Sequence, residues 1–220
     1  MLWFQLSSLS VYAQRFLVLF TAITIHEFAH GFVADRLGDP TARNSGRLTL
    51  NPLSHLDPIG AVCMVLFRFG WAKPVPFNPY YFRNRKRDTA LVSLAGPAAN
   101  ILLAFASTII FVPFYVFVFD PFRNAVTYFI LGTLKSLVSL NIAFAVFNLI
   151  PFPPLDGSKI LGAILPNSTY MDLLRYERFG FPVLFILSMM GILGQVLGVI
   201  IDPVYGLWNG LVDFLIHLIK

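Results

Sequence analysis

The chain has little charge, little cysteine and little glutamate. Asp, Glu, Lys and Arg together make up 12% of its 220 residues, and hydrophobic residues make up 57%, whereas a soluble domain carries about 25% charged residues. A water-soluble fold would lack polar surface, so an integral membrane protein fits better. The single cysteine, Cys63, excludes an intrachain disulfide and a cysteine-rich zinc module. The two glutamates, Glu27 and Glu177, are too few for a di-iron carboxylate bundle.

Long apolar runs account for most of the sequence. A helix needs about 20 mostly apolar residues to cross a bilayer, and four runs reach this length: 14–36, 90–119, 125–150 and 179–201. Residues 203–219 have apolar side chains at helical spacing, which suits either a further span or a helix lying in the membrane interface. The sequence therefore predicts an all-α membrane protein, a polytopic bundle of five or six transmembrane helices.

Part of the chain between the first two spans does not fit a long helix. Residues 59–67 are apolar but too short to cross alone, and the prolines of the stretch 71–79 (WAKPVPFNP) exclude a helix there. Residues 43–52 have the pattern of a loop that enters a short strand. We therefore expect a short strand or hairpin element at the cytoplasmic edge of the membrane.

Lysine and arginine are distributed unevenly along the chain. Nine of them fall between residues 36 and 87 and three between 151 and 179, but none lies in the first fourteen residues. Because cytoplasmic loops are rich in Lys and Arg, these two segments should face the cytoplasm. The cluster at 83–87 (RNRKR) is best explained as such a topology signal, with binding of anionic lipid as the alternative. The cluster stands at the head of an apolar span rather than on a soluble face, so no nucleic-acid partner is expected.

A cluster of ionisable residues, His26-Glu27-x-x-His30, interrupts the first apolar run. On a helix, residues four apart lie on one face, so both histidines can offer a ring nitrogen to one metal ion. Glu27 projects beside them and is placed to act as a base rather than as a ligand. This arrangement suits catalytic zinc, since the metal activates a water and the glutamate takes its proton. The alternative is a polar helix end whose histidines are hydrogen-bonded inside the bundle.

A catalytic zinc site usually has three protein ligands, and the residues leave two candidates for the third. Asp156 follows the proline-rich stretch 151–154, where the chain returns to the cytoplasmic side after two spans. There it would lie level with the two histidines, although it could instead cap the helix that follows. His55 is the other candidate.

Four segments together resemble the motifs of the site-2 protease family, whose members are membrane-embedded zinc metalloproteases. They are HEFAH at 26–30, NPLSHLDPIG at 51–60, GPAAN at 96–100 and NLIPFPPLDG at 148–157. The resemblance covers about residues 15–165 and follows the motif order of the family. It implies that His26, His30 and Asp156 hold one Zn²⁺ ion per chain and that Glu27 is the general base.

The resemblance also implies roles for two further polar residues. Asn100 would hold the substrate backbone or the developing oxyanion, as an amide donor can. The alternative for Asn100 is an interhelical hydrogen bond. His55 would line the active-site cleft and assist water or substrate.

The resulting expectation is one membrane-embedded protease domain over residues 1–220, with a catalytic core at about 14–165 and C-terminal helical segments at about 179–219. It resembles the short, minimal form of the family, without a PDZ or regulatory domain. We expect an intramembrane zinc endopeptidase, surrounded by the lipid bilayer, that cleaves membrane-protein or peptide substrates with a transmembrane segment. Its active site should lie near the cytoplasmic face of a prokaryotic inner membrane. The alternative is an inactive or metal-binding membrane scaffold of the same fold.

Overall fold

The fold is built from helices and irregular loops. The structure is a computed structural model and describes residues 2–67, 71–118 and 125–219. Within these ranges the α-helices are α1 (Leu2–Arg36), α2 (Thr41–Asn44), α3 (Pro58–Phe67), α4 (Arg85–Phe117), α5 (Ala125–Asn148), α6 (Asp156–Ile164), α7 (Asn167–Arg175), α8 (Glu177–Met189) and α9 (Ile192–Ile219). Two short 3-10 helices, η1 (Pro52–His55) and η2 (Pro79–Tyr81), lie in the connection from α2 to α4. The predicted all-helical class is thus confirmed.

Four helices are long and apolar enough to cross a membrane. They are Val11–Arg36 within α1, and α4, α5 and α9. The expected count of five or six is not confirmed in the described residues, because the apolar run 179–201 is divided between α8 and α9. The break falls at Gly191, whose φ of 73° suits glycine. With 13 residues, α8 is about 20 Å long, too short for a hydrocarbon core of about 30 Å. Residues 203–219 belong to α9.

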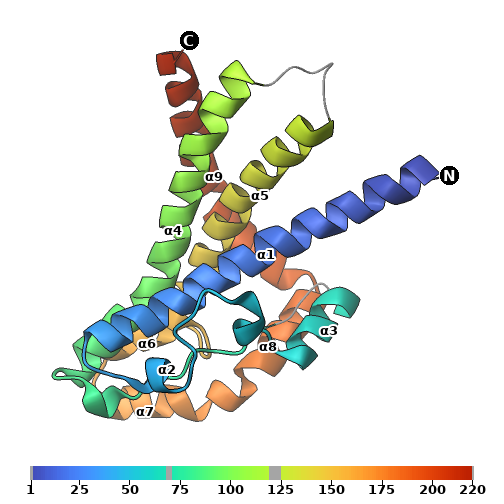
Figure 1. Ribbon diagram of the computed structural model, residues 1–220. Helices are drawn as coiled ribbons and strands as arrows, with labels where there is room; N and C mark the ends of the chain where they lie inside the picture. The colour runs from blue at the N-terminus through green and yellow to red at the C-terminus, as the bar shows by residue number, and fades with distance from the viewer. Residues whose placement is uncertain (1, 68–70, 119–124, 220) are drawn as a thin grey trace.

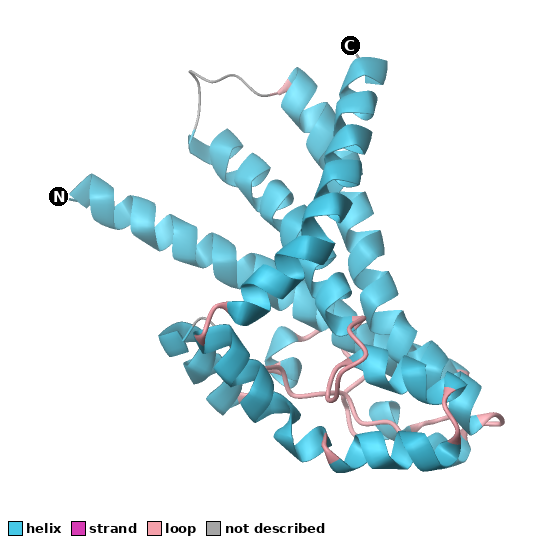
Figure 2. Ribbon diagram, turned by 180° about the vertical axis from the view of Figure 1, so that it is seen from behind, coloured by secondary structure: helices cyan, strands magenta, loops and turns pink. Residues whose placement is uncertain are grey.

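Most of the short helices gather at one end of the long helices. In Figure 1, α4, α5 and α9 stand beside one another and α1 crosses them obliquely. Both chain termini lie on the upper side in this view, whereas α2, α6 and α7 gather at the bottom. Figure 2 shows the same division from behind. The central helix is α4, which packs against α1, α5, α6 and α9.

Hydrogen bonds between polar side chains and neighbouring helices join the long helices. Trp208 Nε1 on α9 donates to Thr108 Oγ1 on α4 at 2.9 Å, and the Tyr205 hydroxyl donates to the Ser139 carbonyl on α5 at 2.7 Å. In lipid, interhelical hydrogen bonds of this kind help to fix which helices pair. Many large apolar side chains on α4, α5 and α9 remain exposed, as expected for surfaces that contact lipid.

The strand expected at the membrane edge is replaced by helix and extended chain. The short apolar run forms α3 instead, because the Asp57 side chain accepts a hydrogen bond from the first turn of that helix at 2.8 Å. Strand-type pairing in the described residues is limited to one antiparallel bridge between Leu56 and Ala72. The proline-rich stretch 71–78 is nevertheless not helical, as its composition predicts.

Candidate metal centre

Three buried side chains from two helices meet at one point. His26 and His30 lie one turn apart on α1, and Asp156 is the first residue of α6. The two Nε2 atoms are 3.0 Å apart, and each lies 3.2 Å from Asp156 Oδ2. All three residues are buried. Within the described residues these three are the His, Cys, Asp or Glu side chains close enough together to hold a metal ion, and we call them the ligand group.

The ligand group has the dimensions of a zinc site. Tetrahedral zinc with bonds of ~2.0–2.1 Å separates its nitrogen and oxygen ligands by about 3.3 Å, close to the 3.0 and 3.2 Å found here. Asp156 Oδ2 is buried and accepts no hydrogen bond within the described structure, which leaves it available to a cation. Gly96 keeps space for an ion, because a Cβ there would lie 2.5 Å from His30 Nε2 and 2.6 Å from His26 Cε1. These residues therefore fit one zinc ion.

Helix α4 fixes the orientation of both imidazole rings. His26 Nδ1 donates to Asn100 Oδ1 at 2.6 Å, and His30 Nδ1 donates to the Val92 carbonyl at 2.7 Å. Because the protons sit on Nδ1, the Nε2 lone pairs of both rings are free to bind a metal. Val92, Gly96 and Asn100 are spaced by four residues and so lie on one face of α4.

The first residue of α6 is positioned by the loop before it. Residues 149–155 carry the chain from α5 to α6. A Cβ on Gly157 would lie 2.3 Å from the Leu149 carbonyl oxygen and 2.4 Å from that of Ile150. Glycine at this position therefore allows α6 to begin close enough to the loop for Asp156 to reach the histidines.

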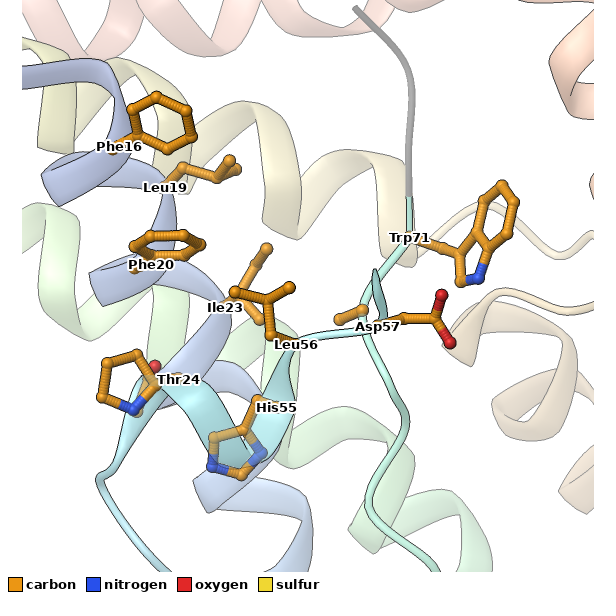
Figure 3. A pocket seen from close by; sticks show the side chains of 11 residues that line it. Phe16, Leu19, Phe20, Ile23, Thr24, His55, Leu56, Asp57 and Trp71 are labelled. Atoms are coloured by element: carbon orange, nitrogen blue, oxygen red, sulfur yellow. The ribbon is translucent and has the colours of Figure 1, made fainter. Parts of the chain in front are cut away.

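The structure separates the two candidates for a third ligand. Asp156 joins the ligand group, with Oδ2 lying 3.2 Å from each histidine Nε2. His55 lies outside the group and donates from Nε2 to the Thr49 carbonyl at 2.9 Å. It lines a pocket beside α1 (Figure 3) that contains no residue of the ligand group, so its expected place in the active-site cleft stays a prediction.

Glu27 lies between the two histidines in sequence, but a different segment holds its carboxylate. Glu27 Oε2 accepts a hydrogen bond from Val75 N at 2.8 Å, and the residue is buried. The extended stretch 71–78 therefore passes directly beside Glu27. Glu27 does not belong to the ligand group, and this position next to a metal centre suits a base.

Asn100 is fully buried and hydrogen-bonded on all sides. Besides accepting from His26, it donates to the Ala22 carbonyl at 3.2 Å and to Asn141 Oδ1 at 2.6 Å. Both amide hydrogens are engaged, so neither is available to a substrate or an oxyanion in this arrangement. These hydrogen bonds join α4 to α1 and α5, as the alternative interpretation of Asn100 expects.

Two residues of the site were given no role in the sequence analysis, although Gly96 belongs to the motif at 96–100. Asn141 on α5 is 0% exposed and accepts from Asn100, and Gly96 provides the clearance described above. Asn141 carries a weak signal, since it is one of the few strongly polar residues in the run 125–150, together with Lys135 and Asn148. The clearance at Gly96 has no such signal, because it depends on how α1 and α4 pack.

Comparison with known proteins identifies the family. The model of "Peptidase family M50" matches residues 116–191. "Putative zinc metalloprotease YwhC" of Bacillus subtilis is 36% identical over 182 residues, which cover 81% of this chain and 81% of the relative. This chain belongs to peptidase family M50. "Putative zinc metalloprotease Rip2" is 32% identical over 172 residues in Mycolicibacterium smegmatis and 30% identical over 173 residues in Mycobacterium tuberculosis.

These matches confirm the resemblance to site-2 proteases. The M50 member spans 81% of YwhC but 62% and 63% of the two Rip2 proteins. No solved structure matches it. Its family makes it a zinc-dependent peptidase, and the family together with four apolar helices makes it a multi-pass integral membrane protein.

Proposed function

We propose that this M50 member is an intramembrane endopeptidase that hydrolyses peptide bonds in or near the transmembrane segments of other membrane proteins. His26, His30 and Asp156 would hold its zinc ion, and Glu27 would be the general base. The observation that carries the proposal is the convergence of three buried donor atoms within 3.2 Å of one another. Glu27, which metal binding alone does not require, supports an enzyme over an inactive scaffold.

The proposed site lies inside the membrane but near one face. Both histidines belong to the candidate span Val11–Arg36. His30 precedes Arg36 by six residues, which places it about 9 Å from the basic end of the helix at 1.5 Å per residue. The loops at this end carry most of the lysines and arginines, so we assign it to the cytoplasmic side, most simply of a prokaryotic inner membrane.

The proposed chemistry divides between the ion and the protein. When bound, zinc supplies a Lewis acid that activates water and polarises a carbonyl. Glu27 takes a proton from the attacking water and later delivers it to the leaving amide nitrogen. The Val75 N–H fixes one Glu27 oxygen, so the base keeps its position during both transfers. Asn100 and the Val92 carbonyl keep the two imidazoles in the required tautomer.

The substrate must expose a peptide bond that a transmembrane helix normally shields. Local unwinding frees backbone N–H and C=O groups, which need partners in lipid. The extended stretch 71–78 beside Glu27 is the natural place for an unwound segment to align. A substrate with a helix-weakening residue near the scissile bond should therefore be cut faster than one with a stiff helix. Equal rates for the two substrates would contradict this view of recognition.

Two substitutions test the proposed function on one preparation. Purified protein in detergent is assayed for zinc per chain and for cleavage of a model transmembrane substrate. Glu27→Gln should keep zinc and lose at least about 100-fold in rate, the usual contribution of a general base. His26→Ala should lose both zinc and activity. If Glu27→Gln cleaves as fast as the wild type, or if no transmembrane substrate is cleaved, the endopeptidase proposal fails and a scaffold role gains support.

A further inference from the structure

A large open pocket lies between the first turns of α4 and the last turns of α6. These two helices pack against each other, and α6 lies at the lower end of α4 in Figure 1. The volume of the pocket is about 470 Å³. Among the described residues that line it, none belongs to the ligand group and Glu27 is absent. The proposed hydrolysis therefore leaves this pocket without a role.

The pocket has a basic end and an apolar wall. Lys86 and Arg87 provide the charge, and the described lining residues include no aspartate or glutamate. Farther along α4 the lining becomes apolar, with Leu91 and Leu94, and Ile160 of α6 adds to it. A ligand that fills this pocket should therefore combine a negative charge with an apolar part.

The basic end retains donors that can bind an anion. Lys86 Nζ donates to the Leu165 carbonyl at the end of α6 at 2.7 Å, so the ammonium group reaches from α4 to α6 and carries further N–H donors. Arg87 is paired with Asp88 at 2.9 Å, but its side chain is 65% exposed. The four basic residues at 83–87 outnumber this one carboxylate. The end of the pocket therefore has a surplus of positive charge.

These charges lie level with the basic end of α1. His30 Nδ1 donates to the Val92 carbonyl, so the two residues mark one depth on helices that run in opposite directions. Lys86 and Arg87 precede Val92 by six and five residues, which corresponds to about 9 and 7.5 Å at 1.5 Å per residue. Arg36 lies about 9 Å beyond His30 in the same direction. Both cations thus lie at the membrane edge, where lipid phosphates are found.

The apolar wall continues along α4 toward the middle of the bilayer. Arg87, Leu91 and Leu94 follow one another at spacings of four and three residues, so they lie on one face of the helix. Ala98 and Leu102 continue this face at spacings of four, and all of these residues are exposed. An acyl chain could follow this face from the basic end into the hydrocarbon, whereas a soluble anion would leave the apolar wall uncovered.

We propose that this pocket binds one anionic phospholipid. Lys86 and Arg87 bind its phosphate, and an acyl chain lies against Leu91 and Leu94 beside α6. The sequence explains the cluster at 83–87 as a topology signal, with anionic lipid as the alternative. The pocket adds a defined lipid site to that signal, because charge and apolar wall occur together at the membrane edge. This inference does not depend on the proposed peptidase activity.

The test measures how many lipids each chain binds and how tightly. Purified protein in detergent is titrated with dioleoyl phosphatidylglycerol, or with neutral dioleoyl phosphatidylcholine, and native mass spectrometry counts the bound lipid. One double variant, Lys86→Gln with Arg87→Gln, removes both charges that line the pocket. The matched control, Arg83→Gln with Arg85→Gln, removes two charges of the same cluster that do not line it. Ala163→Leu narrows the pocket and keeps every charge.

The wild type should bind one phosphatidylglycerol per chain, about 10-fold or more tightly than phosphatidylcholine. Lys86→Gln with Arg87→Gln should lower this affinity by about 30-fold, equivalent to about 1 kcal/mol for each cation. Ala163→Leu should also weaken binding, because it takes volume from the pocket. The control pair should change the affinity by less than about 3-fold, since exposed charges outside a site contribute little.

Several results would overturn the lipid site. Equal losses in the two double variants would show a diffuse attraction to the basic cluster, and equal affinity for the two lipids would show ordinary contact with bilayer lipid. Displacement of phosphatidylglycerol by an excess of inorganic phosphate would assign the pocket to a soluble anion. Wild-type affinity in Ala163→Leu would show that the lipid binds elsewhere.

Folding is checked independently by the zinc content of each variant. If the double variant at Lys86 and Arg87 loses zinc, Ala163→Leu and the comparison of the two lipids decide. Substrate cleavage is not a readout of this experiment. Failure of the peptidase proposal would therefore leave the lipid site intact, and failure of the lipid site would leave the peptidase proposal intact.

Discussion

Replacing Gly96 by alanine should abolish zinc binding without unfolding the protein. The added methyl group would stand 2.5 Å from His30 Nε2 and 2.6 Å from His26 Cε1, whereas non-bonded heavy atoms prefer about 3.5 Å or more. Relief of this overlap requires about 1 Å of movement, several times the ~0.2 Å tolerance of ligand distances at a metal site. We expect zinc affinity to fall by at least about 100-fold, the upper end of the effect of losing an outer hydrogen-bond partner.

The same substitution should not weaken α4 itself. Alanine is favoured over glycine in a helix interior by about 0.8–1.0 kcal/mol, and without zinc the imidazoles are free to move away from the methyl group. The zinc-free variant should therefore unfold at or above the temperature of the zinc-free wild type. Added zinc should raise the unfolding temperature of the wild type but not that of the variant. Competition with a chelator and thermal unfolding in detergent measure the two effects.

A control for this experiment is available on α9. Gly206 is also within a long apolar helix, and no atom lies within 4 Å of the position that its Cβ would take. Gly206→Ala should bind zinc as the wild type does. Wild-type affinity in Gly96→Ala would show that the ion does not occupy the space beside Gly96, and the assignment of the ligand group would be wrong. Unfolding of the zinc-free Gly96→Ala protein would show that the overlap is not confined to the metal centre.

Further predictions concern the hydrogen bonds around the site and between the helices. Asn100→Leu removes the acceptor of His26 and should lower zinc affinity by about 10- to 100-fold, whereas Asn141→Leu acts only through Asn100 and should have a smaller effect; equal losses in a chelator titration would contradict this order. Thr108→Val removes the acceptor of Trp208 and should lower the free energy of unfolding by about 1 kcal/mol. Zinc content should not change in Thr108→Val, and a loss of zinc there would contradict the separation of the two regions.

The sequence alone predicts the parts of the site that depend on spacing within one element. The four-residue spacing of His26 and His30 brings their rings together on any α-helix. In the structure, the two Nε2 atoms are indeed 3.0 Å apart. Asp156 was one of two candidates on chemical grounds, and the family resemblance favoured it. The structure brings it into the group because Gly157 lets α6 start against the preceding loop.

Features that depend on packing between elements could not be predicted. The run 179–201 is apolar throughout, so its composition does not reveal the break that a positive φ at Gly191 introduces. The short run at 59–67 was expected to form part of a strand or hairpin element, although Asp57 followed by Pro58 is a helix-start signal that favours α3. For Asn100 the sequence left open a substrate role and an interhelical hydrogen bond, because it does not show where an amide finds its partners.

The face of α4 explains why two histidines on one helix are not sufficient for this site. Each imidazole can rotate about two side-chain bonds, and α4 restricts both rings by offering an acceptor to each Nδ1. The helices run in opposite directions, since His26 pairs with Asn100 and the later His30 pairs with the earlier Val92. Gly96 lies between the two acceptors and leaves room for the ion. A shift of α4 by one residue relative to α1 would rotate the face that carries Val92, Gly96 and Asn100 by about 100°. Both hydrogen-bond acceptors would then leave the imidazoles, and the space beside Gly96 would be lost. The coordination geometry is therefore set by the register between α1 and α4, and substitutions that move this register should affect zinc before they affect the fold.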